Sequence, residues 1–286
     1  MKKLLLQTTI PHTKDDWSIE RFSMLARYLS ELTDANGNHL YAVSARDREN
    51  TANGDDKILA ALDRSDVDQL WLFGVDIGGG LSGNDCAAIG RFRQRGGGLL
   101  TSRDHQDLGI SFCTIGGIGE AHHFHTKNQE LDAARRSVDD TETPSLSWPN
   151  YHSGDNGDYQ RISVTEPVHV VMLSQKRSSG MIELLPAHPH EGTVSVPYGA
   201  NARVIAKGRS TVTGREFNLA VAFESDGSRG RAVADSSFHH FLDYNFDPSS
   251  GCPSYVTEPT GRGMQDNPQA MEDTKTYIRN LANWLT

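Results

Sequence analysis

A run of polar side chains follows two leucines in the stretch LLTSRDHQDLG, residues 99–109. In a nucleophile elbow, a serine at a sharp strand-to-helix turn is exposed at the edge of a sheet, beside backbone amides that can stabilise an oxyanion. Ser102 stands at such a turn and is a candidate nucleophile, with the amide of Arg103 as an oxyanion donor. The GxSxG form of the turn is absent, and a serine before a helix is most often only its N-cap. Both roles of Ser102 therefore stay open.

Histidines gather in several short segments and supply a competing chemistry. Imidazole is a common zinc ligand, and two or three imidazoles with a carboxylate such as Asp76 or Glu191 leave a coordination position for a catalytic water. The spacings match no compact zinc motif, and any single histidine is more often a structural or surface residue. The expected cofactor of such a site is zinc or another divalent metal. The candidate metal ligands are His105, His122, His188 and His190.

Two further stretches combine side chains suited to a polar ligand. SWPNYHSGDNGDYQ, residues 147–160, mixes aromatic faces with carboxylates and amides, which favours a sugar or another polar metabolite. DSSFHHFLDYN, residues 235–245, follows a predicted strand. An ordered surface loop and a capped helix explain these two stretches equally well. The candidate substrate-binding residues are Trp148, Tyr151, His152, Asp235 and His239.

A parallel sheet is the element that would bring these segments to one place. In the first part of the chain, apolar runs typical of strands alternate with helical patterns. Such alternation implies parallel strands covered by helices on both faces, with ligands bound outside the carboxyl ends of the strands. Strands are predicted at 4–6, 39–45, 69–76 and 97–102, and helices at 19–32, 55–64, 83–96 and directly after Ser102.

The second half of the chain predicts an antiparallel extension of this sheet. A long polar stretch at about 118–165 comes first, and an insertion of that length is usually functional or disordered. Its aromatic residues and histidines favour a part in the site. The later elements are strands at 167–173, 181–187, 202–212, 216–224 and 231–235, and an amphipathic helix over 271–286.

The elbow segment also resembles a known family. GGGLLTSRDHQDLGISFCTIGG is similar to the nucleophile segment of the class I glutamine amidotransferase-like superfamily, in which a strand leads to Cys, then to His and Gln, and a GG pair closes the helix. Ser102 takes the place of the Cys, and His105 and Gln106 match the His and Gln. Asp104 replaces the small residue after the elbow. The likeness is nearest to the ThuA-like branch, whose members also lack the glutaminase Cys, so glutaminase activity is not expected.

Two other motifs fit the same resemblance. FGVDIGGG, residues 73–80, lies where the superfamily carries a Gly-rich oxyanion loop, which implies that Gly78 and Gly79 approach the substrate. LLPAHPHEG resembles the late His-Pro-Glu motif of the superfamily, with one extra residue. The resemblance implies His188 or His190 as the base and Glu191 as the residue that orients it.

Composition narrows the classes of partner. The chain has 286 residues with a formal charge of -9, which argues against a general nucleic-acid binder or a protein bound to anionic membranes. No apolar run approaches the length needed to span a bilayer. Cys86, Cys113 and Cys252 are widely spaced and suggest neither a disulfide framework nor a Cys-rich zinc site. The expectation is a cytoplasmic protein that binds a small molecule, with a homo-oligomer left open.

These patterns predict one α/β domain over residues 1–286, a flavodoxin-like three-layer sandwich of the amidotransferase-like kind with a mostly parallel central sheet and an antiparallel extension. The predicted activity is hydrolysis of a small polar, carbohydrate-derived metabolite. Two mechanisms compete, one with Ser102 as nucleophile and one with a His-bound metal that activates water. The alternative is a metal-free binding or regulatory module that keeps the fold without catalysis.

Overall fold

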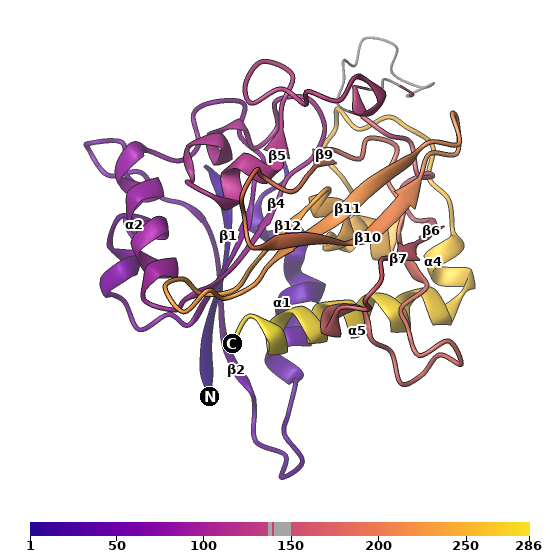
Figure 1. Ribbon diagram of the computed structural model, residues 1–286, viewed down its shortest axis with the longest axis horizontal. Helices are drawn as coiled ribbons and strands as arrows, with labels where there is room; N and C mark the ends of the chain where they lie inside the picture. The colour runs from indigo at the N-terminus through magenta and orange to yellow at the C-terminus, as the bar shows by residue number, and fades with distance from the viewer. Residues whose placement is uncertain (137–138, 140–149) are drawn as a thin grey trace.

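A mixed eight-stranded sheet forms the centre of the molecule (Figure 1). The computed structural model describes residues 1–136, 139 and 150–286. The neighbouring strands in the first part of the sheet are mutually parallel. In spatial order they are β2 (Tyr41–Arg48), β1 (Lys2–Pro11), β3 (Gln69–Phe73), β4 (Gly98–Ser102) and β12 (Ala232–Asp235).

The sheet continues in antiparallel sense beyond β12. The added strands are β11 (Glu216–Phe223), β10 (Ala202–Arg209) and the short β7 (Ser163–Val164). The order of the parallel strands is the flavodoxin-like one, in which the chain reverses its direction of winding between β1 and β3. The predicted α/β fold with an antiparallel extension is therefore confirmed.

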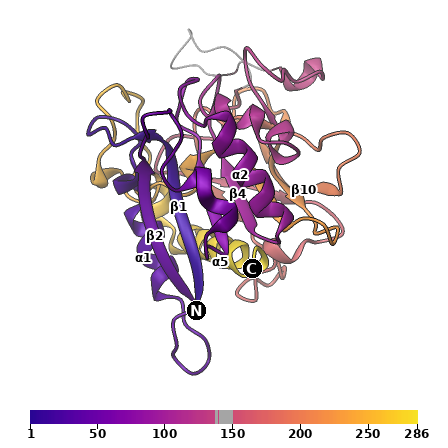
Figure 2. The same ribbon diagram turned by 90° about the vertical axis from the view of Figure 1, so that its left-hand side faces the viewer.

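Helices cover both faces of the sheet because successive apolar side chains along its strands point to opposite faces, and each face must be buried. Leu4 and Leu6 of β1 belong to the core under α1 (Ser23–Glu31) and α5 (Pro268–Trp284). Leu5 points to the other core, under α2 (Gly83–Gln94). Figures 1 and 2 show α2 on one side of the strands, and α1 and α5 on the other.

Local sequence explains where two of these helices begin. Ser82 and Asp85 form a capping box at the start of α2, in which each side chain accepts a bond from the other residue's backbone amide. Asn267 caps α5, and Pro268 occupies the first turn, where its missing amide hydrogen costs nothing. The remaining helices and strand pairs are short: α3 (Asp243–Phe246), α4 (Gly263–Asp266), β5 (His122–His123) with β9 (Thr193–Val194), and β6 (Tyr159–Arg161) with β8 (Leu184–Pro186).

Three local predictions are wrong. The segment after Ser102 is not an α-helix but a turn that leads into a 3-10 helix at Ile110–Thr114. The backbone leaves the right-handed helical region at Gln106, with a φ of 49°, and at Gly109, with a φ of 75°, and the buried Arg103 guanidinium donates to the carbonyl groups of Gln106 and Leu108. The predicted helix at 55–64 and the predicted strand at 167–173 contain 3-10 turns instead, at Leu59–Arg64 and Val170–Met172.

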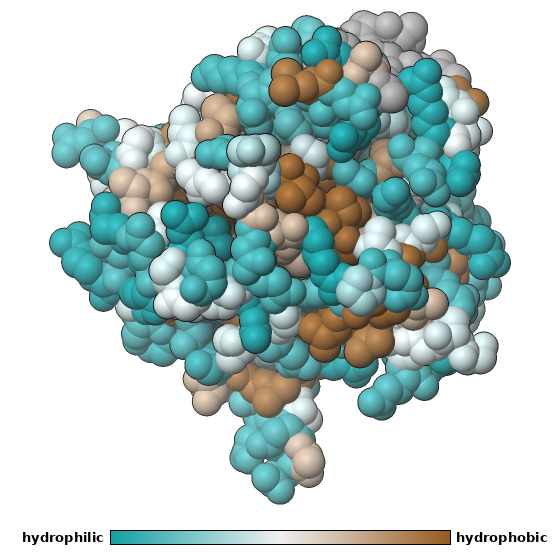
Figure 3. Space-filling view, in the orientation of Figure 1, coloured by the Kyte–Doolittle hydropathy of each residue, from teal (hydrophilic) through white to brown (hydrophobic). Residues whose placement is uncertain are grey.

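Polar side chains cover most of the face seen in Figure 3, and apolar ones gather near its centre, over the region of β10 and β11. Within the described residues, no helix is both long enough and apolar enough to cross a bilayer.

Candidate active site

A cavity of about 530 Å³ opens at the carboxyl edge of the sheet. It is lined by Ile10 near the end of β1, Val75 after β3, Asp104 after β4 and His239 after β12. This position includes the point between β1 and β3 at which flavodoxin-like folds bind ligands. The remaining wall comes from three other parts of the chain, at Asn156, around His188 and around Tyr255.

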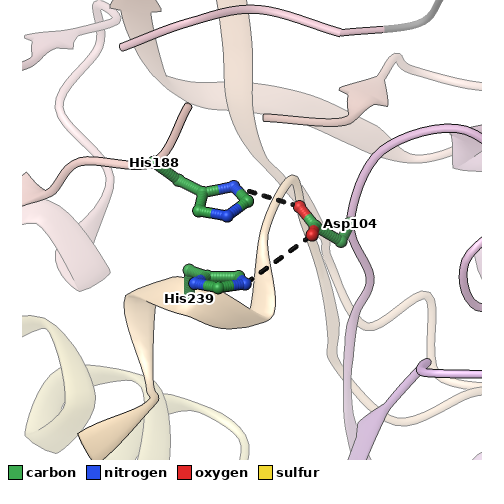
Figure 4. A group of neighbouring side chains, drawn as sticks. All are labelled: Asp104, His188 and His239. Carbon is green, nitrogen blue, oxygen red and sulfur yellow. Dashed lines mark ion pairs between the residues drawn. The ribbon is translucent and has the colours of Figure 1, made fainter. Parts of the chain in front are cut away.

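Asp104, His188 and His239 form a compact group on the wall of this cavity, here called the cavity cluster (Figure 4). Nδ1 of His188 lies 3.2 Å from Oδ1 of Asp104, and Nε2 of His239 lies 3.7 Å from Oδ2. The two imidazole rings stack with their centres 3.5 Å apart. One ligand atom from each residue lies within 4.8 Å of the other two, and all three side chains are buried.

The hydrogen bond between His239 and Asn245 determines the tautomer of the His239 ring. The amide nitrogen of Asn245 donates to the carbonyl oxygen of Ala187 at 2.9 Å, so its Oδ1 must face the other way. That oxygen lies 2.7 Å from Nδ1 of His239, which therefore carries the proton and donates it. In the neutral ring, Nε2 is left with a lone pair directed at Asp104.

Nδ1 of His188 has two neighbours. The backbone amide of His190 lies 3.2 Å away and donates to this nitrogen when the ring is neutral, whereas the protonated ring donates to Asp104 instead. The same nitrogen is the one that lies beside Asp104. The turn from 188 to 190 thus fixes which atom of the ring is offered to the carboxylate.

The charges of the cavity cluster favour a cation between the three groups. Burial lowers the pKa of His239 well below its usual value, and the nearby charge of His188 acts in the same direction. Burial alone would raise the pKa of Asp104, but attraction to His188 and His105 outweighs it and holds this pKa far below the normal range. An ionised carboxylate and two imidazole nitrogens therefore converge, and with both rings neutral they form the donor set of a divalent metal site.

His105 and His190 lie next to the cavity cluster. Nδ1 of His105 is 3.1 Å from Oδ2 of Asp104, and its ring centre is 4.8 Å from that of His190. Nε2 of His190 is 3.2 Å from Oε1 of Glu258. Burial lowers the pKa of His105 despite its carboxylate neighbour. Both rings line the cavity, so the structure brings four of the predicted histidines together: His105, His188, His190 and His239.

Glu191 and Asp235 belong to a second, closed group, here called the buried triad, with His240 between them. Nδ1 of His240 lies 2.8 Å from Asp235, and Nε2 lies 3.2 Å from Glu191. Burial opposes the charged form of His240, but the two carboxylates outweigh it and raise its pKa to about 10. Ser236 donates to Glu191 at 2.8 Å and Tyr277 donates to Asp235 at 2.8 Å. The triad does not line the cavity.

Ser102 and Arg103 also lie away from the cavity. Ser102 is fully buried, and its hydroxyl contacts Oδ1 of Asp235 at 3.4 Å. Arg103 is buried beneath the loop, where its guanidinium donates to the carbonyl of His123 at 2.5 Å and lies over the ring of Phe124. The elbow segment reaches the cavity through Asp104, His105 and Leu108, and the sequence marked Asp104 only as a departure from the family pattern.

The glycine loop after β3 meets the cavity through Gly79, whereas Gly78 is set back from it. Gly78 has a φ of 124°, which favours glycine, and its amide donates to Asp76 at 3.1 Å. Asp76 also accepts the hydroxyl of Ser111 at 2.8 Å. These bonds hold the loop that forms one wall.

The other predicted residues lie outside the cavity. Tyr151 is fully buried and stacks on Phe217, His152 contacts Thr211, and His122 contacts Thr101. Trp148 lies outside the described residues. The long polar stretch does contribute Asn156 to the wall.

Sequence reasoning missed four residues that line the cavity: Asp16, Trp17, Tyr255 and Glu258. They come from two loops distant in the chain, which are joined where the amide of Ser254 donates to Asp15 at 2.6 Å. Neither loop has a strand-end position or a motif that would mark it. Their polar and aromatic composition was the only available sign.

Comparison with solved structures finds partial similarity to several proteins. A putative ThuA-like protein from Bacteroides uniformis is 9% identical, with a TM-score of 0.47 over 99% of this chain and 91% of the other. The glutaminase domain of Trypanosoma brucei CTPS with bound acivicin is 13% identical, with a TM-score of 0.49 over 99% and 93%. Agd3, a carbohydrate deacetylase, is 12% identical, with a TM-score of 0.40 over 82% of this chain and 29% of its own.

These similarities include the ThuA-like and amidotransferase-like proteins that the sequence resembles. They assign no activity to this chain. No protein-family model and no curated protein matches the sequence.

Proposed function

We propose that the protein is a metal-dependent hydrolase of a small polar metabolite, with Asp104, His188 and His239 as the metal ligands. The observation that carries the proposal is the convergence of one carboxylate and two imidazole nitrogens within 4.8 Å, on the wall of a cavity. Catalytic zinc sites commonly use three protein ligands and leave a further position for water or substrate.

The surroundings of the cavity cluster support this donor set. Metal-bound histidines almost always donate their second ring N–H to a carbonyl or carboxylate, which fixes the ring. Asn245 accepts that bond from His239 at 2.7 Å. Ser237 donates to Oδ1 of Asp104 at 3.3 Å and steadies the carboxylate. Of the histidines predicted as ligands, the proposal keeps His188 and replaces the others with Asp104 and His239.

A bound divalent metal would supply Lewis acidity and lower the pKa of a bound water. The chain itself would orient the substrate and handle protons. His105 engages Asp104 through Nδ1 and lies in the cavity, so its Nε2 is the atom we assign to accept a proton and return it to the leaving group. His190, held by Glu258 at 3.2 Å, would orient a substrate hydroxyl or carbonyl.

The cavity dimensions set the size of the substrate. A volume of about 530 Å³ lies within the range of sites for small metabolites. Ser102 has no part in this proposal, because its hydroxyl is buried against Asp235.

The experiment is metal analysis of purified protein after equilibration with zinc or manganese. We expect one equivalent in the wild type and in His12→Ala, whose side chain is exposed and far from the cavity cluster in sequence. His239→Ala should lose the metal. Metal that stays bound to His239→Ala, or no binding by the wild type, would overturn the proposal. A wild-type protein that binds polar ligands without metal would instead favour the non-catalytic binding module.

A further inference from the structure

Among the described residues that line the cavity, the permanently charged side chains are all negative. Its carboxylates are Asp16, Asp76, Asp104 and Glu258, and no Lys or Arg belongs to the described lining. A single divalent cation at Asp104 would leave an excess of negative charge. Phosphate and carboxylate groups are normally received by Arg, Lys or a helix N-terminus, so this wall disfavours an anionic substrate.

Asp16 is placed to receive a cation. Its Oδ1 accepts two bonds, from the backbone amide of Trp17 at 2.7 Å and from the hydroxyl of Tyr255 at 2.9 Å. These bonds fix the carboxylate. Its Oδ2 has no hydrogen-bond or ion-pair partner among the described residues, and the side chain is half-buried at the cavity wall.

Arg21 lies beside Asp16 without forming an ion pair with its side chain, and its guanidinium lies over the Trp17 ring, 5.7 Å from the ring centre. The Arg21 guanidinium donates to backbone carbonyl groups. Its Nε donates to the carbonyl of Asp16 at 2.8 Å, and its Nη1 donates to the carbonyl of Gly251 at 2.9 Å. No ion pair within 4.0 Å joins its guanidinium to the Asp16 side chain in the described chain. The role of Arg21 is to tie the two loops together, while the Asp16 charge stays available to the cavity.

Aromatic groups flank this carboxylate. The side chains of Trp17 and Tyr255 line the cavity, and Trp17 packs edge-on against His239 with ring centres 5.0 Å apart. A carboxylate beside aromatic surfaces is a favourable setting for an ammonium group, which the carboxylate attracts and the ring faces tolerate. The contact between Trp17 and His239 also places this corner next to the cavity cluster.

We infer that the substrate carries a primary amino group, which Asp16 receives between Trp17 and Tyr255 while the reacting bond lies at the cavity cluster. The inference rests on the proposed function in taking this cavity as the substrate site. The ligand class is a small amino-substituted polar molecule, such as an amino sugar or amino alcohol. Its phosphorylated and carboxylated relatives are excluded by charge.

The test compares the binding of D-glucosamine, D-glucose and D-glucose 6-phosphate, which share a ring and differ in charge. Calorimetric titrations use wild type, Asp16→Asn and Asp15→Asn, each with and without bound metal. Asp16→Asn keeps an acceptor for Trp17 and Tyr255 but removes the charge. Asp15→Asn is the matched control, because Asp15 holds Ser254 in the same pair of loops and does not line the cavity.

We expect wild type and Asp15→Asn to prefer the amine, and Asp16→Asn to bind it about 10-fold to 100-fold more weakly, the effect of losing a hydrogen bond to a charged group. Equal binding of amine and sugar, binding of neither, or equal losses in the two variants would overturn the inference. If the protein prefers the amine through Asp16 but binds no metal, the inference is supported and the metal site is rejected. Metal binding without amine preference would support the metal site and overturn the inference.

Discussion

Two histidine–carboxylate groups lie at the same edge of the sheet and differ in how their protons are used. In the buried triad, both nitrogens of His240 face carboxylate oxygens, at 2.8 and 3.2 Å. In the cavity cluster, the proton of His239 points away, toward Asn245, and its lone pair faces Asp104. His239 and His240 are adjacent in the chain, yet one completes an ion pair and the other offers an acceptor.

This difference in proton positions makes the buried triad a structural group and the cavity cluster a group suited to bind a ligand. In the buried triad, two carboxylates share the His240 cation and accept further bonds from Ser236 and Tyr277, so it has little left to offer a metal or a substrate. In the cavity cluster, the Asp104 carboxylate and the lone pair of His239 face each other, and a cation between them would stabilise this arrangement. Burial alone does not distinguish them, because all six side chains are buried.

The largest effect should come from neutralising the carboxylate of the cavity cluster. Asp104→Asn keeps the shape but replaces an anionic ligand with a neutral one. We expect metal affinity to fall more than about 1,000-fold, beyond the ~10-fold to 100-fold typical of residues that only support ligands. Competition with a chelating dye measures it. An affinity within tenfold of wild type would mean that Asp104 does not touch the metal.

Breaking the buried triad should affect stability instead. His240→Gln leaves Asp235 and Glu191 without their shared cation, and an uncompensated buried charge costs about 3–5 kcal/mol. Urea unfolding of metal-free protein gives the change. A loss below about 1 kcal/mol would show that the triad is not held by its ion pairs.

A smaller effect is expected from the residue that fixes the His239 tautomer. Asn245→Leu removes the acceptor for the Nδ1 proton, so the ring can turn or shift its proton. Metal affinity should fall by about 10-fold to 100-fold, as for other outer-sphere partners. The measurement is made at a temperature where circular dichroism shows the variant folded. Unchanged metal affinity would show that Asn245 does not control how His239 binds the metal.

The smallest effect is expected at Ser102, which contacts Asp235 at 3.4 Å. Ser102→Ala should cost about 1 kcal/mol or less, the net worth of one hydrogen bond, and should leave metal binding unchanged. A serine-directed phosphonate should not label the wild type at this position. Labelling at Ser102 would reinstate the nucleophile mechanism over the metal one.

The sequence indicated these two histidine–carboxylate groups only through their positions near the ends of predicted strands. The alternation of strands and helices predicted the parallel sheet, and the strand ends directed attention to His105, His188, His190 and His239, which line one cavity. Asp104, the proposed metal ligand, lies two residues after Ser102, the predicted centre of the elbow, in a turn that is not helical.

The sequence by itself determined the layers of the fold and the edge at which its polar residues meet, because hydrophobic periodicity and chain order are local properties. Only the tertiary structure decided which member of each neighbouring pair reaches the cavity: Asp104 and not Ser102, His239 and not His240. That choice depends on where other segments place their hydrogen-bonding groups: the Ala187 carbonyl accepts from the Asn245 amide, which turns Oδ1 of Asn245 toward the proton of His239. The same holds for Asp16 and Tyr255, which became neighbours through the contact between two loops with no common motif.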